Sequence, residues 1–564
     1  MQRPPEFSFR TRASNLDALA CGSFDVLVVG GGITGAGVAR DAALRGLSVA
    51  LIERKDFASG TSSRSSKLVH GGLRYLQQGD VGLVREAATE RYVLRQLAPH
   101  LARPMQMLVP VSTRSGYAKI KVGLWTYDRL AGVSEGEQYR MLSREETLAL
   151  EPTLRPDGVY GAGLYYEYLT DDARLVMETV KSAAALGAVI VNHCEVTGFV
   201  SEGERVAGVT WCDRATGAEG VARAQVIINA AGPWVDAVRL LCERGESPRL
   251  HLTKGIHLGL RPERLGPSRS VVMNASDRRG VFAIPRDAIT YIGTTDTEYV
   301  GPYDDPFITL DDVSYLLEAA ERTFAVDRLS PDDVVSAWAG LRPLLHQEGK
   351  KPSELSRKDE IMIGAGGLLS IAGGKLTTFR RMAQRIVDLA CEQLHATGRT
   401  LPAPVGESER VPLSGGDTGD DVAAYSGRLQ RRWPSVPADI VARLVAVYGS
   451  NAERMVEGMA ADPVLATRCA PVLAVTRAEV EYAVREEMAL GLEDFLERRS
   501  RLFLWDPENG LDAAPAAARW MANVLGWSVQ RTDDEVAEYR AHVQHVKGFQ
   551  ADVGTAEPAR AAQA

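Results

Sequence analysis

A glycine-rich turn between a short apolar strand and a helix, near the N-terminus, constrains this chain more than any other feature. The strand covers residues 26–29, the helical run covers 35–44, and a second strand at 48–52 ends at Glu53. Three glycines follow the G-x-G-x-x-G spacing, and they are Gly30, Gly32 and Gly35. Strand, turn, helix, strand and acid in this order are typical of a dinucleotide-binding βαβ unit.

Each residue type has a physical role in such a unit. Gly30 permits the tight turn after the strand, Gly32 lets a pyrophosphate approach the backbone, and Gly35 lets the helix pack closely. The helix N-terminus offers N–H groups and a partial positive charge to the phosphates. Glu53 lies at the offset of a carboxylate that accepts hydrogen bonds from a ribose hydroxyl, and it disfavours a 2′-phosphate. NAD and FAD share this unit, so the turn alone leaves the choice between them open.

The composition disfavours several other classes of protein. The net charge of −8, from 65 basic and 73 acidic residues, argues against a nucleic-acid partner. Six cysteines without a C-x-x-C pair argue for a reducing compartment and against a disulfide framework or a zinc site. The first 20 residues lack the apolar core of a secretory signal, and no apolar run is long enough to span a bilayer. We therefore expect a cytoplasmic protein, free or bound to the cytosolic surface of a membrane.

Further motifs follow the turn in order along most of the chain. They are T-S-S-R-S-S-K-L-V-H-G-G-L-R-Y at 61–75, A-P-H at 98–100, D-D-A-R-L-V at 171–176, N-A-A-G-P-W at 229–234, K-G-I-H at 254–257, I-G-T-T-D-T-E-Y at 292–299, G-L-R-P-L at 340–344 and G-G-K-L-T-T-F-R at 373–380. With these motifs the sequence resembles the FAD-dependent, quinone-linked glycerol-3-phosphate dehydrogenases of the aerobic type. The resemblance implies FAD, bound without a covalent link. Two departures from the family pattern are Ala231, where Thr is commoner, and Phe379, where Tyr is commoner.

The resemblance also implies the architecture. We expect an α/β protein with a Rossmann-like FAD-binding domain, an inserted antiparallel-sheet substrate domain of the glycine oxidase and D-amino-acid oxidase type, and a C-terminal all-α domain. The FAD-binding domain is expected to be discontinuous, because the segments 225–234 and 361–376 return to the cofactor. The expected division is an N-terminal arm at 1–20, the FAD-binding domain at 21–100, 170–249 and 355–396, the substrate domain at 101–169 and 250–354, a linker at 397–420, a helical domain at 421–548 and a disordered tail at 549–564.

Periodicity and capping signals predict individual helices. Apolar residues at helical spacing predict one helix over 84–97 and another over 174–186. The tetrapeptides that begin at Thr476 and Thr532 have capping-box spacing and predict helix starts in the C-terminal domain. His542 and His545 share one face of a predicted helix, but without a third ligand we expect no metal site.

Residues 105–132 mix large apolar and aromatic side chains with lysines and arginines. Such a segment can lie in the headgroup layer of a membrane, or it can be a half-buried surface element of the substrate domain. Because members of the resembled family are peripheral membrane proteins, the resemblance gives the two interpretations equal weight.

Oxidation of an alcohol by a flavin requires a base for the hydroxyl proton and a positive group beside the flavin, and a phosphorylated substrate adds a need for cations. His257 is the expected base, since imidazole titrates near neutrality. Lys375 is placed beside the flavin by its motif and is the expected positive group. Arg342 is expected to bind the substrate phosphate or to orient the substrate hydroxyl.

The expected binding residues come from the same motifs. The stretch 56–67 is rich in small hydroxyl residues, and we interpret it as a polar wall against the cofactor rather than as a flexible loop. The expected substrate-binding residues are Arg74, Tyr75, Thr295 and Asp296. The expected FAD contacts are Gly30, Gly31, Gly32, Ile33, Thr34, Gly35, Glu53, Thr61, Ser62, Ser66, Lys67, His70, Gly71, Gly72, Val196, Ala230, Gly232, Trp234, Gly374, Lys375, Leu376 and Thr377.

The resemblance implies a function in glycerol catabolism and respiratory electron input. The expected reaction is oxidation of sn-glycerol 3-phosphate to dihydroxyacetone phosphate, with FAD reoxidised by a membrane quinone, in a homodimer on the inner face of the cell membrane. A glycerol-3-phosphate oxidase that uses O2, an FAD-dependent amine or amino-acid oxidase and a non-catalytic FAD sensor are the alternatives. Arg74, Tyr75 and Arg342 favour a phosphate over an amino-acid substrate, and the presence of Lys375 argues against a sensor.

Overall fold

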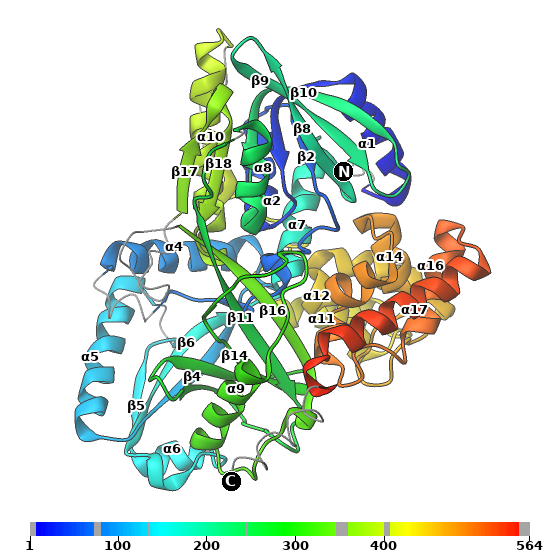
Figure 1. Ribbon diagram of the computed structural model, residues 1–564. Helices are drawn as coiled ribbons and strands as arrows, with labels where there is room; N and C mark the ends of the chain where they lie inside the picture. Colours follow the sequence, from blue (N-terminus) through cyan, green and yellow to red (C-terminus); the bar gives the residue numbers. More distant parts are fainter. Residues whose placement is uncertain are drawn as a thin grey trace, which may run out of the picture.

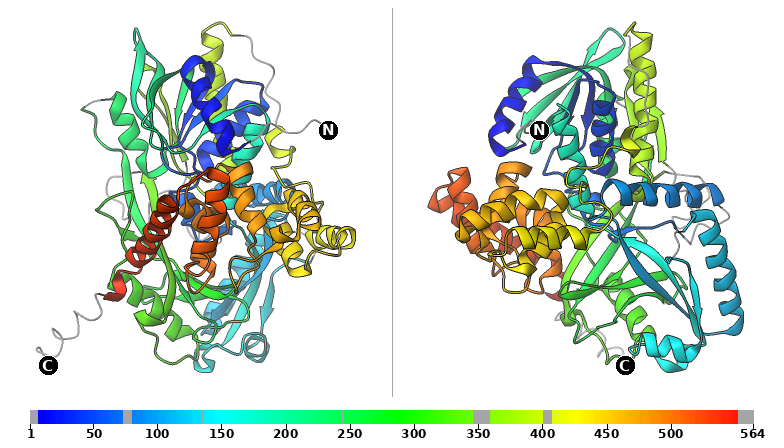
Figure 2. Two further views of the ribbon diagram at one scale, coloured as in Figure 1. Left: turned by 90° about the vertical axis from the view of Figure 1, so that its right-hand side faces the viewer. Right: turned by 180° about the vertical axis from the view of Figure 1, so that it is seen from behind.

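Two β-sheets and a group of C-terminal helices make up the molecule (Figure 1). The computed structural model describes residues 7–72, 80–133, 136–243, 245–345, 359–399 and 407–551. The first sheet forms one end of the molecule, the second sheet forms the other end, and the C-terminal helices pack beside the place where the two meet (Figure 2). None of the described helices combines the length and the apolar character that crossing a bilayer requires.

The first sheet has the order β17-β18-β10-β1-β2-β7, and a hairpin of β8 and β9 extends it from β10. Its strands are β1 (Ser23–Val29), β2 (Val49–Ile52), β7 (Val189–Val191), β8 (Cys194–Glu202), β9 (Arg205–Asp213), β10 (Glu219–Asn229), β17 (Asp359–Ile363) and β18 (Leu369–Gly373). β1 runs parallel to both β2 and β10. The run 26–29 is continuously apolar because a central parallel strand is covered on both faces.

Helices cover both faces of this sheet. On one face α2 (Ile33–Leu44), α7 (Asp172–Ala185) and α10 (Phe379–Ala396) pack against one another and against the strands. On the other face lie α1 (Phe9–Cys21) and α8 (Val235–Cys242). Strands and helices from three distant stretches of sequence therefore share one core.

The second sheet has the order β15-β11-β14-β13-β12-β4-β6-β3, with β16 paired to β11 and β5 paired to β6. Its strands are β3 (Leu68–Val69), β4 (Arg103–Val111), β5 (Arg140–Leu142), β6 (Gly161–Leu169), β11 (Leu250–Leu260), β12 (Ser270–Asn274), β13 (Gly280–Arg286), β14 (Ile289–Gly293), β15 (Thr297–Glu298) and β16 (Val334–Leu345). All of these pairs are antiparallel except β12 with β4. The long strands β11 and β16 run from this sheet to its junction with the first (Figure 1).

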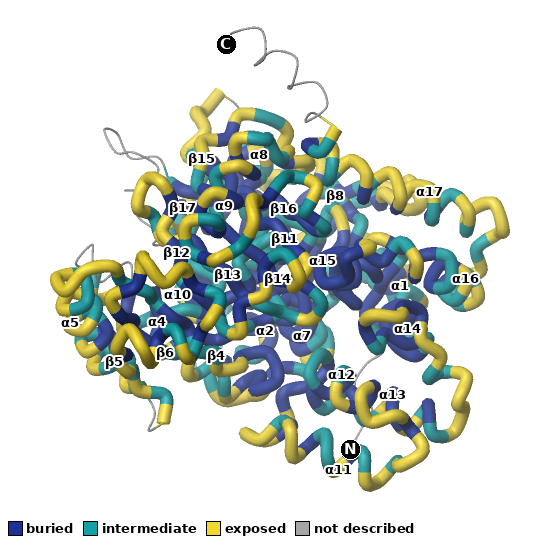
Figure 3. The backbone as a smooth tube through the Cα atoms, turned by 90° about the horizontal axis from the view of Figure 1, so that it is seen from below, coloured by how far each residue is buried: buried dark blue, intermediate teal, exposed yellow. Residues whose placement is uncertain are grey.

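Among the described residues, the helices that accompany the second sheet are α4 (Val81–Leu97), α5 (Arg114–Ala131), α6 (Arg144–Leu150) and α9 (Leu310–Thr323). The predicted helix 84–97 is confirmed as α4. The segment 105–132, treated as one amphipathic stretch in the sequence, divides into the strand β4 and the helix α5. Helix α5 lies along the outer edge of the molecule (Figure 3). Its buried residues are Leu124 and Tyr127.

The C-terminal helices are α11 (Val422–Arg432), α12 (Ala438–Tyr448), α13 (Ala452–Ala461), α14 (Arg477–Glu487), α15 (Leu502–Trp505), α16 (Ala514–Leu525) and α17 (Val529–Val546). Thr476 caps α14 in a capping box with Glu479, as predicted. The predicted helix start at Thr532 is wrong, because α17 already begins after Ser528, whose hydroxyl accepts the N–H of Arg531. The short α15 is buried near the centre of the molecule (Figure 3).

Two segments expected to be loose are ordered in their described parts. Of the linker, the part after residue 406 packs on α2, where the Arg40 side chain donates to the carbonyl of Ser408 at 3.0 Å. At the start of the expected tail, Phe549 is buried and the Gln550 amide donates to the carbonyl of Val334 at 3.0 Å.

The expected loose N-terminal arm is wrong over residues 9–20, which belong to α1. Ser8 and Thr11 form a capping box at its start. The buried Arg12 donates to the carbonyl of Asn192 at 2.7 Å and forms an ion pair with Asp213. The helix has no broad apolar stripe in its sequence, so this buried polar anchor, made with residues far along the chain, was not predictable.

Replacing Arg12 with Ala is expected to destabilise the protein by about 3–5 kcal/mol, because the buried Asp213 carboxylate loses its ion pair. The measurement is the free energy of unfolding in urea. Arg10→Ala, at an exposed position of the same helix, is the control and is expected to change stability by less than about 0.5 kcal/mol. Equal stability of the two variants would contradict the anchoring of α1.

Candidate active site

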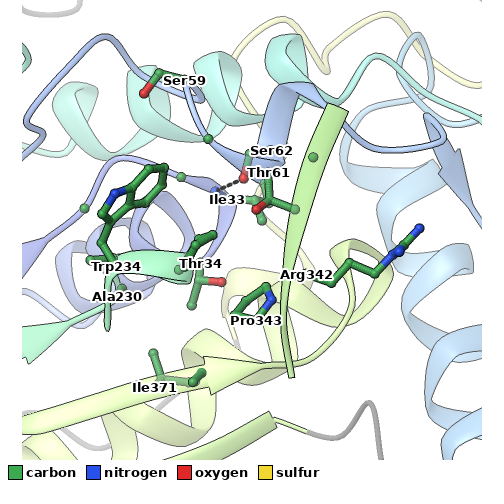
Figure 4. Close-up of a pocket in the computed structure, with 18 of the residues that line it drawn as sticks. Ile33, Thr34, Ser59, Thr61, Ser62, Ala230, Trp234, Arg342, Pro343 and Ile371 are labelled. Carbon is green, nitrogen blue, oxygen red and sulfur yellow. Dashed lines mark hydrogen bonds between the residues drawn. The ribbon is translucent and has the colours of Figure 1, made fainter. Parts of the chain in front are cut away.

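A cavity of about 640 Å³ lies where the carboxyl end of the first sheet meets β11 and β16. Side chains from the start of α2, from the turn η1 (Thr61–Ser63) and from β16 converge on it (Figure 4). Glu53 lines one part of the cavity, and His257 and Arg342 line another. Ligands bind at this edge of open α/β sheets because the carboxyl ends of parallel strands meet there.

The glycine-rich turn forms the cavity wall at the start of α2. Gly30 has a φ of +109°, and a Cβ at this position would lie 2.7 Å from the carbonyl oxygen of Ala230. A Cβ at Gly35 would overlap the carbonyl oxygen of Gly30. Gly32 is the N-cap of α2 and makes no side-chain cap, so the positive end of this helix faces the cavity. The Ser62 hydroxyl accepts the N–H of Ile33 at 3.0 Å (Figure 4).

Glu53 is held in place at the end of β2. Its carboxylate accepts the N–H of Gly31 at 2.6 Å and the N–H of Lys55 at 2.8 Å. Burial raises the pKa of Glu53, and these two hydrogen bonds oppose that rise. Gly31 does not line the cavity itself, and its contribution is to fix the carboxylate that does.

His257 lies on β11 in a nearly closed environment. Its side chain is 2% exposed, its Nε2 is 2.8 Å from the Ser66 hydroxyl, and its ring stacks on Trp338 with centroids 4.9 Å apart. Burial, with smaller contributions from the charges of Lys67 and Arg342, holds the pKa of His257 well below its usual range. The imidazole is therefore unprotonated at neutral pH, and its burial and the two nearby cations disfavour its protonated form.

Arg342 lies on β16, on the strand pair β11–β16 that also carries His257. Its guanidinium donates to Asp296 Oδ1 at 3.0 Å, to the Thr294 hydroxyl at 2.9 Å and to the carbonyl of Thr295 at 3.0 Å. A Cβ at Gly255 on the neighbouring strand would overlap this guanidinium. Asp296 therefore orients an arginine of the cavity wall, although it does not line the cavity.

Lys375 follows a two-glycine turn after β18. Gly373 and Gly374 have φ values of +77° and +80°, and Lys375 then starts the turn η7 (Leu376–Thr378), which leads directly into α10. Lys375 lines the cavity together with Gly374, Leu376 and Thr377. The side chain of Thr377 accepts the N–H of His70 at 3.2 Å, which ties the hydroxyl-rich segment to this corner.

Most of the expected residues line the cavity, and several of the others support it from behind. The expected residues that line the cavity are Gly30, Gly32, Ile33, Thr34, Glu53, Thr61, Ser62, Ser66, His70, Val196, Ala230, Gly232, Trp234, His257, Arg342, Gly374, Lys375, Leu376 and Thr377. The expected residues outside its lining are Gly31, Gly35, Lys67, Gly71, Gly72, Thr295 and Asp296. Arg74 and Tyr75 lie outside the described residues.

The supporting residues have identifiable contacts. A Cβ at Gly71 would overlap the hydroxyl of Tyr127. The absence of a side chain at Gly71 therefore lets Tyr127 of helix α5 pack against this segment. The Thr295 hydroxyl accepts the N–H of Ile256 at 3.0 Å inside the sheet. Lys67 is fully buried and bonds to Asp172 at 2.9 Å, away from the cavity.

Sequence reasoning missed Arg54 and Trp338. Arg54 lines the cavity and lies over the ring of Trp234 at 5.2 Å. Its position directly after Glu53 was the one sequence signal that could have indicated that Arg54 lines the cavity. Trp338 pairs in register with His257 across β11 and β16, a relation that appears only once the two strands are aligned.

One group of side chains in the described part of the chain has the spacing of a metal site, and it consists of Asp56, His193 and Asp494. The Asp56 carboxylate accepts hydrogen bonds from Arg498 and Arg499, each at 2.7 Å. Two guanidinium groups therefore already compensate its charge, and the cluster joins the first sheet to the C-terminal helices.

Comparison with known proteins agrees with a cofactor site at this cavity. Residues 25–380 match the family model described as FAD dependent oxidoreductase, and residues 407–532 match the C-terminal domain of alpha-glycerophosphate oxidase. An aerobic glycerol-3-phosphate dehydrogenase of Staphylococcus aureus is 39% identical over 93% of this chain and 95% of its own. The structure of the glycerol-3-phosphate dehydrogenase from Bacillus halodurans complexed with FAD has a TM-score of 0.80 and 35% identity, over 96% of this chain and 98% of that one.

A more distant structure shares the fold alone. Glycine oxidase from Geobacillus kaustophilus, at 22% identity and a TM-score of 0.51, covers 66% of this chain and 95% of its own. The matches confirm the predicted fold class and FAD as the predicted cofactor.

Replacing Glu53 with Ala is expected to raise the dissociation constant for FAD about tenfold or more, because the acceptor of two backbone N–H groups, which is also the predicted acceptor for the ribose hydroxyl, is lost. The measurement is quenching of FAD fluorescence on titration of the apoprotein. Glu195→Ala, a second carboxylate on the cavity wall that pairs with Arg214, is the control and is expected to bind FAD as the wild type does. Equal affinities for all three proteins would remove Glu53 from the cofactor site.

Proposed function

We propose that this chain, which belongs to the aerobic glycerol-3-phosphate dehydrogenase family of FAD-dependent oxidoreductases, oxidises sn-glycerol 3-phosphate to dihydroxyacetone phosphate and passes the electrons to a membrane quinone. The observation that carries the proposal is the convergence of His257, Arg342 and Lys375 on the cavity that the glycine-rich turn opens into. A neutral imidazole, a guanidinium and an ammonium there match a phosphorylated alcohol and the charge that its oxidation creates.

The residues around the cavity fit FAD, bound without a covalent link. The Glu53 carboxylate suits the adenosine ribose, and the turn at Gly30 and Gly32 with the positive end of α2 suits the pyrophosphate. The turn at Gly374 and Lys375 suits the flavin end, because a cation and the start of α10 stabilise the negative charge of a reduced flavin. When bound, FAD supplies the two-electron acceptor for the substrate.

His257 acts as the general base in this proposal. Its ring is unprotonated at neutral pH, and it lines the cavity in which the substrate is proposed to bind. Trp338 stacked on one face of the ring and Ser66 at Nε2 restrict its rotation. Restriction of this kind keeps a base aligned with the proton that it must accept.

Arg342 binds the substrate phosphate, with Arg74 and Tyr75 as its expected partners from the 61–75 motif. The guanidinium is held by Asp296 and by two threonines of the same loop, so it is oriented before a substrate arrives. A planar guanidinium makes paired hydrogen bonds to a phosphate, and this geometry favours a phosphate ester over an unphosphorylated alcohol.

The proposal includes binding to the inner face of the cell membrane, where a quinone would be reached, and helix α5 is the surface proposed to bind there. Val122 and Trp125 are 64% and 49% exposed, and Arg129 lies over the Trp125 ring at 5.0 Å. Lys121 is exposed on the same helix. Exposed apolar and aromatic side chains beside cations suit the headgroup layer of an anionic membrane. A homodimer is part of the proposal on the family resemblance alone.

The test of the reaction is anaerobic addition of sn-glycerol 3-phosphate to the purified holoenzyme. Bleaching of the flavin band at about one equivalent supports the proposal, since FAD accepts two electrons. Reoxidation by a soluble quinone analogue much faster than by air supports the quinone over O2 as acceptor. A flavin band that glycine or D-alanine bleaches, and that sn-glycerol 3-phosphate leaves unchanged, would overturn the substrate.

Replacing Arg342 with Ala is expected to lower kcat/KM for sn-glycerol 3-phosphate by about two to four orders of magnitude, because a preorganised phosphate ligand is lost. FAD content is expected to stay at the wild-type level, since the residues proposed to bind FAD remain. Arg279→Ala is the matched control, because Arg279 contacts the same Asp296 from outside the cavity. Unchanged kinetics of the Arg342 variant would remove this residue from the site.

Replacing Lys121 and Trp125 with Glu is expected to release the protein from vesicles of phosphatidylethanolamine and phosphatidylglycerol, measured by co-sedimentation. The change places negative charge and removes apolar contact on the surface of α5. Arg428→Glu with Val529→Glu is the control, since it makes the same change of net charge on exposed residues of the C-terminal helices. Equal co-sedimentation of both double variants and wild type would exclude α5 as the membrane surface.

A further inference from the structure

A buried charged cluster behind His257 has no part in the reaction as described so far. Lys67 and Asp172 are both fully buried, and Lys67 Nζ lies 2.9 Å from the carboxylate. The ammonium also donates to the carbonyl of Ser63 at 2.6 Å. Burial lowers the pKa of Lys67 to about 7, and the Asp172 carboxylate opposes that change.

The third charge of this cluster comes from the C-terminal domain. Arg501 precedes α15, and its side chain is 3% exposed. Its Nη2 donates to Asp172 Oδ1 at 2.9 Å, and its Nε lies 3.5 Å from Asp171. The backbone of Arg501 is left-handed, with a φ of +64°, so its neighbours hold it in an unfavourable conformation that presents the guanidinium to Asp172.

Asp172 also holds the segment that contacts His257. Its Oδ2 accepts both the N–H of Ser65, at 3.1 Å, and the Ser65 hydroxyl, at 2.7 Å. The next residue, Ser66, places its hydroxyl 2.8 Å from His257 Nε2. The carbonyl of Ser65 accepts the indole N–H of Trp338 at 3.2 Å, and Trp338 is the ring on which His257 stacks. One carboxylate thus supports two of the contacts that fix the imidazole.

We propose that Arg501 is a positioning residue for His257. It holds the Asp172 carboxylate against Ser65, and Ser66 and Trp338 transmit that position to the imidazole. The C-terminal domain thereby completes the active site, although its described residues do not line the cavity. The inference rests on the role proposed above for His257, and it assigns a function to the E-R-R-S-R stretch at 497–501.

A purely structural role of the arginines is the competing explanation, and the chain offers a matched control for it. Arg499 belongs to the same segment, is 1% exposed, and donates to the Asp56 carboxylate at 2.7 and 2.8 Å. It joins the C-terminal domain to the first sheet with no contact to Ser65, Ser66 or Trp338 among its hydrogen bonds and ion pairs. Loss of Arg499 weakens domain docking, while loss of Arg501 also releases the support of His257.

The experiment is a double-mutant cycle on the rate constant of anaerobic flavin reduction by sn-glycerol 3-phosphate. Arg501→Gln and Ser66→Ala are made singly and together, and Arg499→Gln is made singly and with Ser66→Ala. If Arg501 acts through Ser66, we expect Arg501→Gln to slow reduction about tenfold in the wild-type background and less than about threefold in the Ser66→Ala background. The apparent KM is expected to stay within about threefold of wild type, since no phosphate ligand changes.

The effects of Arg499→Gln and Ser66→Ala on the rate constant of flavin reduction are expected to multiply. Arg499→Gln should therefore change this rate constant by the same factor in the wild-type and Ser66→Ala backgrounds. FAD content and Tm are measured for every variant. If Arg501→Gln does not fold with FAD, Arg501→Lys replaces it, because Lys keeps the charge and loses the planar fork.

The outcomes separate this inference from the proposed function. Non-additivity confined to the Arg501 pair supports positioning, whereas multiplicative effects for both arginines overturn it. Wild-type flavin that sn-glycerol 3-phosphate does not reduce overturns the proposed reaction instead. Wild-type rates in His257→Ala overturn the role of His257 and the positioning of that residue by Arg501 with it.

Discussion

Two buried carboxylates join the first sheet to the C-terminal helices. Asp56 follows a strand of the first sheet, Asp172 starts a helix of the same layer, and each accepts an ion pair from arginines of the C-terminal domain. A buried charge that loses its partner costs about 3–5 kcal/mol, so domain docking and charge compensation depend on each other here. The cavity lies beside this junction, and its shape depends on both sheets being held at a fixed relative position.

Glycines shape the part of the cavity around His257 and Arg342 as much as the larger side chains do. Gly293 pairs in register with His257, and a Cβ at Gly293 would overlap the imidazole. Gly255 leaves room in the same way for the guanidinium of Arg342. The imidazole and the guanidinium are therefore carried by neighbouring strands of a continuous sheet, which is a more rigid support than a loop. The motifs K-G-I-H and I-G-T-T each contain one of these glycines.

Local patterns predicted the parts of this protein that depend on neighbours in sequence. The glycine turn at 30–35, the carboxylate of Glu53 and the cap of α14 all follow from residues a short distance apart. Features that depend on distant pairing were missed or misassigned. The strand register that makes Asp296 a ligand of Arg342, the ion pair that turns Lys67 away from the cavity, and the anchor of α1 at Asp213 each join residues remote in sequence. Motifs pointed to Asp296 and Lys67, but only the fold showed what these residues contact, and no motif pointed to the anchor of α1.

The ion pairs between Asp56 and the arginines at 498 and 499 have a consequence for synthesis on the ribosome. Asp56 and Arg498 are 442 residues apart in the sequence. The glycine-rich turn, the strands β11 and β16 and Lys375 therefore all leave the ribosome before the segment that carries these arginines. Until then the ion pairs that dock the C-terminal helices on the first sheet are absent. The C-terminal domain can therefore reach its final position only after the cofactor-binding sheet and the catalytic strands have been made.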